Sequence, residues 1–172
     1  MRIAILGNSG SGKSTLARWL ASKTNAALLD LDTVAWEPGQ IAVPRDPLVA
    51  RADVRTWCAA RDAWIVEGCY GSLVSVALEY SPRLVFMNPG VSQCLENCRS
   101  RPWEPQKYAS RREQDERLPM LLAWVCAYDT RDDDMSLRAH RRLFDEYRGP
   151  KSELTVQLRL DASDSSVLAW LQ

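Results

Sequence analysis

The chain has 172 residues, about the length of one domain, and 46% of them are hydrophobic, enough to build a single buried core. Its 22 basic and 22 acidic side chains cancel, which argues against nucleic acid or an anionic membrane surface as a partner. No apolar run of about eighteen residues is present, and the apolar stretch after Met1 is too short for a signal peptide, so we expect a cytosolic protein without a membrane span.

Short apolar segments alternate with helical ones along the chain, which is typical of a layered α/β domain. In chain order, strands are predicted at Ile3–Leu6, Ala27–Leu31, Trp64–Val66, Leu84–Met87 and Leu154–Leu158. Helices are predicted at Lys13–Lys23, Leu48–Arg61, Val91–Arg101, Glu113–Tyr128 (with a potential kink at Pro119), Ser136–Tyr147 and Ser166–Leu171. Proline-containing loops are expected near 37–47 and 101–112. Because no repeat or linker divides the sequence, we expect one domain spanning residues 1–172.

The segment after the first predicted strand fits the phosphate-loop pattern G-x-x-x-x-G-K-[ST]. Its residues, all candidates for nucleotide binding, are Gly7, Asn8, Ser9, Gly10, Ser11, Gly12, Lys13 and Ser14, followed by Thr15. The glycines allow the backbone N–H groups to close around phosphate, at the start of a helix whose dipole favours an anion. Lys13 is expected to reach the β- and γ-phosphates and to be catalytic, and the Ser14 hydroxyl to bind Mg²⁺.

Two carboxylates, Asp30 and Asp32, follow the second predicted strand. In open α/β sheets, ligands bind at the carboxyl ends of the strands. We assign Asp32 to the acceptor and its proton, and Asp30 to the surroundings of the metal ion. The alternative is that one or both only cap the next segment.

The third predicted strand is closed by Glu67 and Gly68. A carboxylate at this position suits a role near Mg²⁺, and a glycine leaves room for the acceptor; a solvated glutamate at a strand end is the alternative. Trp36 and Tyr70 follow the two acidic sites, and we expect them to contribute to acceptor binding.

Several arginines surround the predicted loop at 101–112, which we interpret as a lid. They are Arg99, Arg101, Arg111, Arg112 and Arg117. Phosphoryl transfer needs positive charge on the transferring group, and we select Arg101 and Arg111 as catalytic. The alternative is a solvated basic surface.

Five scattered cysteines complete the set of reactive side chains. Cys94 and Cys98 lie one helical turn apart, a spacing compatible with half of a metal site. Because His140 is the only histidine, we interpret them as packed, reduced thiols.

Together these features resemble the adenylate kinase and shikimate kinase branch of P-loop proteins. Leu29–Asp32 with Trp36, and Trp64–Tyr70, more closely resemble bacterial adenylate kinase-like (topology-modulation, FlaR-like) proteins. The resemblance covers nearly the whole chain. It implies an α/β fold of the P-loop NTPase type, with a five-stranded parallel sheet flanked by helices, an arginine-containing lid, and ATP and Mg²⁺ as ligands.

The resemblance does not identify the acceptor. Adenylate kinases carry Asp-Gly-Phe-Pro-Arg after the third strand, where this chain has Glu67–Gly71. Shikimate kinases have a glycine triplet there and a substrate-binding arginine soon after D-x-D, whereas the first arginine after Asp32 is Arg45. We therefore expect a Mg-ATP-dependent phosphotransferase acting on a small molecule. A nucleoside monophosphate kinase, and an ATP-binding regulatory or DNA-associated protein with weak ATPase activity, stay open as alternatives.

Overall fold

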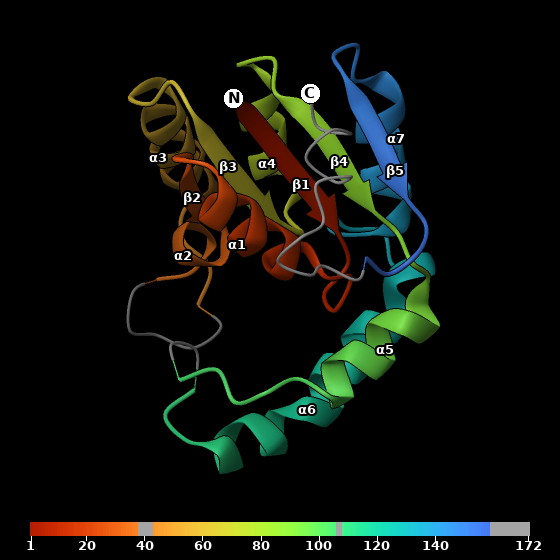
Figure 1. The fold of residues 1–172 in the computed structure, drawn as a ribbon. Coiled ribbons are helices and arrows are strands. Elements are labelled where there is room, and N and C mark those ends of the chain that lie inside the picture. Colours follow the sequence, from red (N-terminus) through yellow and green to blue (C-terminus); the bar gives the residue numbers. More distant parts are fainter. Residues whose placement is uncertain (38–42, 106–107, 159–172) are drawn as a thin grey trace.

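A five-stranded parallel sheet forms the centre of the molecule (Figure 1). The computed structural model of the chain describes residues 1–37, 43–105 and 108–158. The strands are β1 (Arg2–Gly7), β2 (Ala27–Asp30), β3 (Trp64–Gly68), β4 (Arg83–Met87) and β5 (Lys151–Leu154). They lie in the order β2-β3-β1-β4-β5, and every pair of neighbours is parallel. The predicted α/β class with a five-stranded parallel sheet is confirmed.

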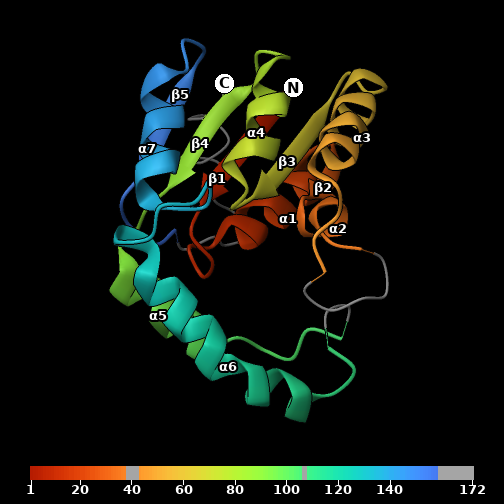
Figure 2. The same ribbon diagram turned by 180° about the vertical axis from the view of Figure 1, so that it is seen from behind.

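Helices cover both faces of this sheet (Figures 1 and 2). In chain order they are α1 (Lys13–Lys23), α2 (Asp32–Ala35), α3 (Pro47–Ala59), α4 (Gly71–Leu78), α5 (Val91–Arg99), α6 (Arg111–Cys126) and α7 (Leu137–Glu146), with a 3₁₀ turn η1 (Ala127–Asp129) after α6. Helix α1 covers one face, and α3, α4 and α7 cover the other. Helices α5 and α6 pack against each other beyond the carboxyl ends of the strands.

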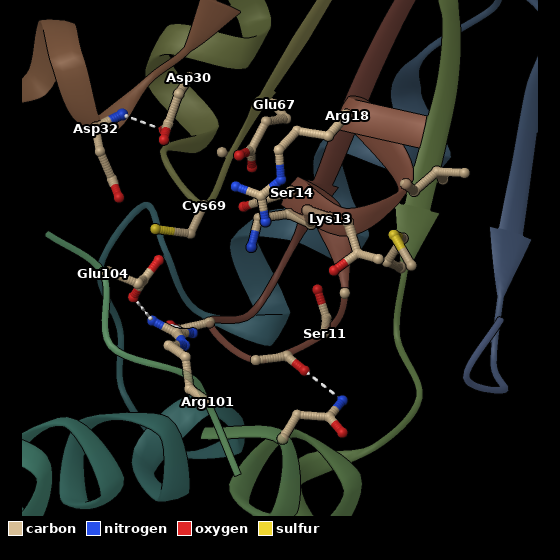
Figure 3. Close-up of a pocket in the computed structure, with 18 of the residues that line it drawn as sticks. Ser11, Lys13, Ser14, Arg18, Asp30, Asp32, Glu67, Cys69, Arg101 and Glu104 are labelled. Atoms are coloured by element: carbon tan, nitrogen blue, oxygen red, sulfur yellow. Dashed lines mark hydrogen bonds and ion pairs between the residues drawn. The ribbon is translucent and has the colours of Figure 1, made fainter. Parts of the chain in front are cut away.

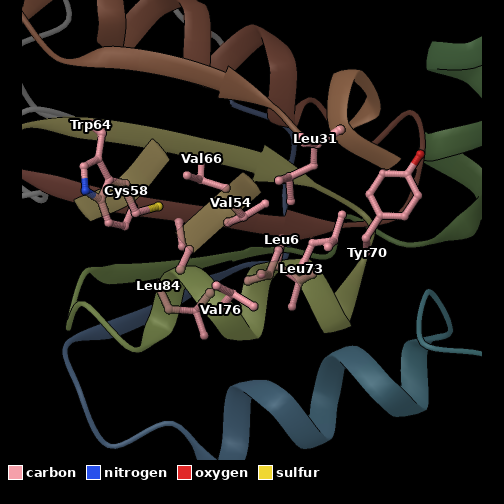
Figure 4. Close-up of a cluster of buried hydrophobic side chains, with 14 of the residues drawn as sticks. Leu6, Leu31, Val54, Cys58, Trp64, Val66, Tyr70, Leu73, Val76 and Leu84 are labelled. Atoms are coloured by element: carbon pink, nitrogen blue, oxygen red, sulfur yellow. The ribbon is translucent and has the colours of Figure 1, made fainter. Parts of the chain in front are cut away.

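The two sheet faces are built by alternation along each buried strand. In β1, Ile3 and Ile5 pack with Leu16 and Leu20 of α1, while Ala4 and Leu6 belong to the core on the opposite face. Figure 4 shows this second core, in which Val54 of α3 and Val76 of α4 meet the strands. Because β1 is buried on both faces, its sequence is a continuous apolar run rather than an alternating one.

The prediction of the last strand was wrong. A strand was expected at Leu154–Leu158, but β5 runs from Lys151 to Leu154 and pairs with β4. The Lys151 ammonium donates to the carbonyls of Phe144, Asp145 and Tyr147 at the end of α7. These bonds fix the start of β5 at Lys151, before the Leu154 at which the alternation of hydrophobic residues predicted it.

Two helices, α2 and α4, were not predicted, and the helix expected at Ser166–Leu171 lies outside the described residues. Helix α6 continues through Pro119. Among the described helices, none combines the length and apolar character needed to cross a membrane.

Candidate active site

The phosphate loop joins β1 to α1 in the predicted context of a buried strand followed by a helix. Gly10 and Gly12 adopt φ values of +78° and +93°, a left-handed conformation that side chains disfavour. A Cβ atom at Gly10 would also lie 2.8 Å from the Cys98 sulfur, so α5 packs directly on the loop. The glycines are therefore required both by backbone conformation and by packing.

Polar side chains hold the loop from two sides. The Asn97 side-chain amide of α5 donates to the Gly10 carbonyl at 2.8 Å, and the Asn8 amide donates to the Val125 carbonyl of α6 at 3.2 Å. The Lys13 ammonium donates to the Asn8 carbonyl at 2.8 Å. The Ser11 hydroxyl is buried and, within the described part of the chain, has no hydrogen-bond partner. A phosphate oxygen would satisfy this hydroxyl, since buried polar groups are nearly always hydrogen-bonded.

A cavity of about 460 Å³ opens in front of this loop (Figure 3). One wall is the phosphate loop with Lys13 and Ser14. Another wall consists of side chains at the carboxyl ends of β2 and β3, namely Asp30, Asp32, Glu67, Gly68 and Cys69. The segment after α5, beginning with Arg101, forms a third side. The predicted phosphate, acidic and arginine sites thus meet at one cavity.

The strand register brings the carboxylates to this cavity. Asp30 pairs with Glu67 between β2 and β3, and Glu67 pairs with Ile5 of β1, two residues before the phosphate loop. Glu67 is only 3% exposed, and burial raises the pKa of its carboxyl group, with Asp30 and Asp32 acting in the same direction. The Lys13 ammonium and a hydrogen bond from Ser14 oppose that increase. Glu67 is therefore not a solvated strand end, because it faces Lys13 and Ser14.

Asp30 has a local contact as well as a place in the cavity wall. Its Oδ1 accepts the backbone N–H of Asp32 at 2.9 Å, at the start of α2. The N-cap residue of α2 is Leu31, so this contact is an Asx turn just before the helix, close to the capping role that the sequence left open as an alternative. Because both aspartates also line the cavity, capping does not remove them from the site.

Tyr70 lies between Trp36 and Asp32. The indole N–H of Trp36 donates to the Tyr70 hydroxyl at 2.7 Å, and that hydroxyl donates to Asp32 Oδ1 at 2.7 Å. Burial, followed by the charges of Cys69 and Asp32, raises the Tyr70 pKa, so the phenol stays protonated. Neither ring is among the residues lining the cavity: the Tyr70 hydroxyl contacts Asp32, and the Trp36 indole contacts that hydroxyl. Acceptor contacts of Trp36 and Tyr70 stay a prediction.

Gly68 is held by packing. A Cβ atom there would lie 2.8 Å from the Leu31 Cβ, closer than real side-chain contacts, so Leu31 occupies the space beside the strand. The glycine also lines the cavity, in keeping with the predicted room for an acceptor.

The two arginines selected from the lid differ in position. Arg101 lines the cavity, where its guanidinium pairs with Glu104 at 3.0 Å and lies 3.4 Å from the Ser9 hydroxyl of the phosphate loop. Arg111 is not among the lining residues; its half-exposed side chain pairs with Asp115 one turn along α6 at 2.9 Å. The structure thus brings Arg101 to the site and places Arg111 on the helix surface.

Comparison with known proteins supports the same assignment of the fold. Neither a family model nor any curated protein matches this sequence. Among solved structures, a gluconokinase from Sinorhizobium meliloti 1021 matches with a TM-score of 0.58 and 20% identity, covering 99% of this chain and 90% of that chain. A shikimate kinase from Bacteroides thetaiotaomicron matches with a TM-score of 0.58 and 17% identity, covering 99% of this chain and 96% of that chain. A deoxyadenosine kinase from M. mycoides with bound dATP matches with a TM-score of 0.54 and 12% identity, covering 99% of this chain and 99% of that chain. The chain has the P-loop NTPase fold.

Mg²⁺ prefers oxygen ligands, and this cavity offers the Ser14 hydroxyl and the carboxylates of Asp30 and Glu67. Over the described ranges, no group of three His, Cys, Asp or Glu side chains is arranged to hold a metal ion. Mg²⁺ at nucleotide sites typically takes one or two carboxylates and completes its shell with phosphate oxygens and water. The donor set therefore fits Mg²⁺ that arrives with a nucleotide, not a metal cage made by protein alone.

Sequence reasoning missed several side chains in and around this cavity. Arg18, five residues after Lys13 on α1, lines the cavity, and so does Asn97. Gln114 of α6 accepts from the Glu104 N–H at 2.8 Å and donates to the Pro102 carbonyl at 3.1 Å, which braces the segment containing Arg101. Helical spacing could have indicated Arg18, because it lies four residues after Ser14 and therefore on the same face of α1.

Proposed function

We propose that the protein is a Mg-ATP-dependent phosphotransferase that moves the γ-phosphoryl group of ATP onto a hydroxyl or phosphate of a small molecule. The observation that carries this proposal is the pairing of two walls around one cavity. Lys13 and Ser14 stand on the phosphate-loop wall, and Asp32 and Glu67 stand on the wall formed by the strand ends. A cavity built this way can hold a nucleotide phosphate chain and an acceptor side by side.

The nucleotide side is assigned to residues 7–15. The loop N–H groups, the α1 N-terminus and the Ser11 hydroxyl would bind the phosphate oxygens. The Lys13 ammonium, which now bonds the Asn8 carbonyl at 2.8 Å, would transfer to the β- and γ-phosphates. Mg²⁺, held by Ser14 with Asp30 and Glu67 nearby, would supply charge neutralisation of the phosphates.

The acceptor side is assigned to Asp32, with Glu67 and Gly68 beside it and Trp36 and Tyr70 behind it. In the reaction, the acceptor oxygen forms a new bond to the γ-phosphorus while the bond from that phosphorus to the β,γ-bridging oxygen breaks, leaving ADP. The acceptor proton passes to the Asp32 carboxylate, which needs to be ionised beforehand. Arg101, already beside the Ser9 hydroxyl, would exchange Glu104 for the transferring phosphoryl group. A role for Arg111 would need movement of α6 toward the cavity, and it stays a prediction, as does a cytosolic location.

Two classes of acceptor are candidates. The neighbours named gluconokinase and shikimate kinase favour a small hydroxylated metabolite, and the deoxyadenosine kinase favours a nucleoside-type acceptor. A nucleoside monophosphate is the alternative retained from the sequence. The regulatory or DNA-associated alternative is disfavoured by the net charge of zero.

A coupled assay of ADP release tests the proposal. The acceptor panel contains sugars, sugar acids, nucleosides and nucleoside monophosphates, each measured against an ATP-only background. We expect one class to raise turnover, and Lys13→Ala to abolish the increase without unfolding the protein. Lys23→Ala, at the other end of α1, is the matched control and should keep activity. Unchanged turnover in Lys13→Ala would refute the assignment, and duplex DNA shifted at low salt would favour the regulatory alternative.

A further inference from the structure

Asp32 accepts a hydrogen bond from Tyr70, which accepts one from Trp36, and these two aromatic residues come from distant parts of the sequence. Trp36 follows α2, and Tyr70 follows β3, 34 residues later. Their rings meet edge to face, with centroids 6.3 Å apart. Both hydrogen bonds in the chain from Trp36 through Tyr70 to Asp32 measure 2.7 Å.

The direction of these hydrogen bonds follows from the chemistry of the donors. An indole nitrogen can only donate, so the Tyr70 oxygen accepts from Trp36. The phenolic proton is then directed to the remaining partner, the Asp32 carboxylate. Because Tyr70 is only 8% exposed, water does not compete for this proton, and the bond to Asp32 is of the stronger, charge-assisted kind.

Tyr70 is itself fixed by the fold. Tyr70 occupies the N-cap position of α4, and the next residue, Gly71, donates its N–H to the Asp134 carbonyl at 3.1 Å. On the other side, the Cys69 carbonyl accepts the His140 Nε2–H at 2.7 Å. Trp36 is placed by a backbone bridge to Pro44. The support for Asp32 therefore reaches the sheet and α7, not only the neighbouring loop.

We propose that Tyr70, oriented by Trp36, is a positioning residue that fixes the Asp32 carboxylate for the acceptor. This inference rests on the proposed function, because it assigns Asp32 to the acceptor. Tyr70 acts through Asp32 and does not itself touch the reacting atoms. Rigid support of this kind matters because small misplacements of a reacting group lower the rate strongly.

A purely structural role for Tyr70 makes a different prediction. If its ring only filled space, loss of the hydroxyl would leave kcat almost unchanged, or would lower activity together with stability. A positioning role instead lowers kcat with little change in the KM for ATP, since the phosphate loop lies on another wall of the cavity. It also makes the effect of Tyr70 depend on the presence of the Asp32 carboxylate.

A kinetic double-mutant cycle separates the two roles. We expect Tyr70→Phe to lower kcat about 10- to 100-fold, the range for losing a hydrogen bond to a charged group, with the KM for ATP unchanged. In an Asp32→Asn background, Tyr70→Phe should cause no further loss. Tyr80→Phe is the matched control, since Tyr80 also meets a tryptophan edge to face, Trp64, and its hydroxyl donates to the Arg55 carbonyl. Equal fold-losses from Tyr70→Phe in both backgrounds would overturn the inference.

A second measurement does not need turnover. The Trp36 indole N–H gives a nuclear magnetic resonance signal that Trp36→Phe identifies by its disappearance. We expect this resonance to move in Tyr70→Phe and, through the shared hydroxyl, also in Asp32→Asn. If it stays in place in Asp32→Asn, the connected chain is refuted. If the wild-type protein transfers phosphoryl to no acceptor, the proposed function fails, and the indole resonance alone decides whether Tyr70 holds Asp32.

Discussion

We predict that His140 makes the stability of this protein depend on pH. The side chain is fully buried between α7 and the segment after β3. Its Nε2 lies 2.7 Å from the Cys69 carbonyl, which can only accept, so Nε2 carries the proton. Its Nδ1, 2.8 Å from the Tyr128 hydroxyl, is then an acceptor. The ring is therefore neutral, and a second proton at Nδ1 would break the bond from Tyr128.

The size of the effect follows from linkage. Burial lowers the His140 pKa from its ordinary 6.5 to about 4, with Lys13 and Arg131 acting in the same direction and the Cys69 hydrogen bond opposing them. A lowered folded-state pKa means that the unfolded chain binds the proton more readily. The stabilisation is thus complete above pH 6.5 and is lost as pH falls toward 4. The loss is about 2 kcal/mol between pH 7 and 5, and about 3 kcal/mol once pH passes the folded pKa.

Urea unfolding at pH 7, 6 and 5 measures this loss. His140→Gln is the reference, because its side-chain amide can still donate to the Cys69 carbonyl but does not titrate in this range. We expect the unfolding free energy of the wild-type protein to approach that of the variant as pH falls. Both proteins have the same carboxylates, so the effect of their titration on the unfolding free energy cancels in the difference between wild type and variant. A difference that stays constant from pH 7 to 5 would refute the neutral, buried assignment of His140.

Three further predictions concern the cavity and its surroundings. In the coupled assay, Arg101→Ala should lower kcat at least about 10-fold more than Arg111→Ala, and equal losses would place Arg111 on phosphate as well. Gly68→Ala should cost about 1–3 kcal/mol of unfolding free energy in urea because of the close approach to Leu31, and Leu31→Ala should relieve part of that cost; additive losses would contradict the contact. In the native protein, a thiol reagent should modify the exposed Cys126 first, and Cys126→Ser should remove that rapid phase; if the phase persists, Cys69 of the cavity wall or one of the buried thiols is more reactive than Cys126.

The parts of the fold that were predicted from sequence carry their own local signals. The apolar run before the glycine-rich loop and the helical pattern after it predicted β1 and α1, and α1 has the predicted bounds of Lys13 and Lys23. The buried strands β3 and β4 are likewise short apolar runs. The ends of β2 and β3 gave the positions of the acidic residues, because parallel strands end at the same edge of the sheet.

Elements determined by contacts between secondary-structure elements were missed or shifted. Helix α4 has the sequence GSLVSVAL, whose valines favour a strand, but five of its eight residues are buried against both strands and helices. The edge strand β5 is placed by Lys151 at the end of α7 and by the ion pair between Glu153 and Arg141 of α7. Neither contact is visible in the local pattern of the sequence.

The same reasoning explains why the acceptor side was predicted less well than the phosphate side. Phosphate binding uses consecutive backbone groups, so a contiguous motif is sufficient to identify it. The acceptor site that we propose depends on Asp32, Trp36 and Tyr70, which meet only after β2 and β3 have paired. Because Tyr70 contacts the Asp32 carboxylate and Trp36 contacts Tyr70, neither aromatic residue carries information about the shape of the acceptor. The acceptor must therefore be sought by assay, while the group that would receive its proton can be tested by mutation.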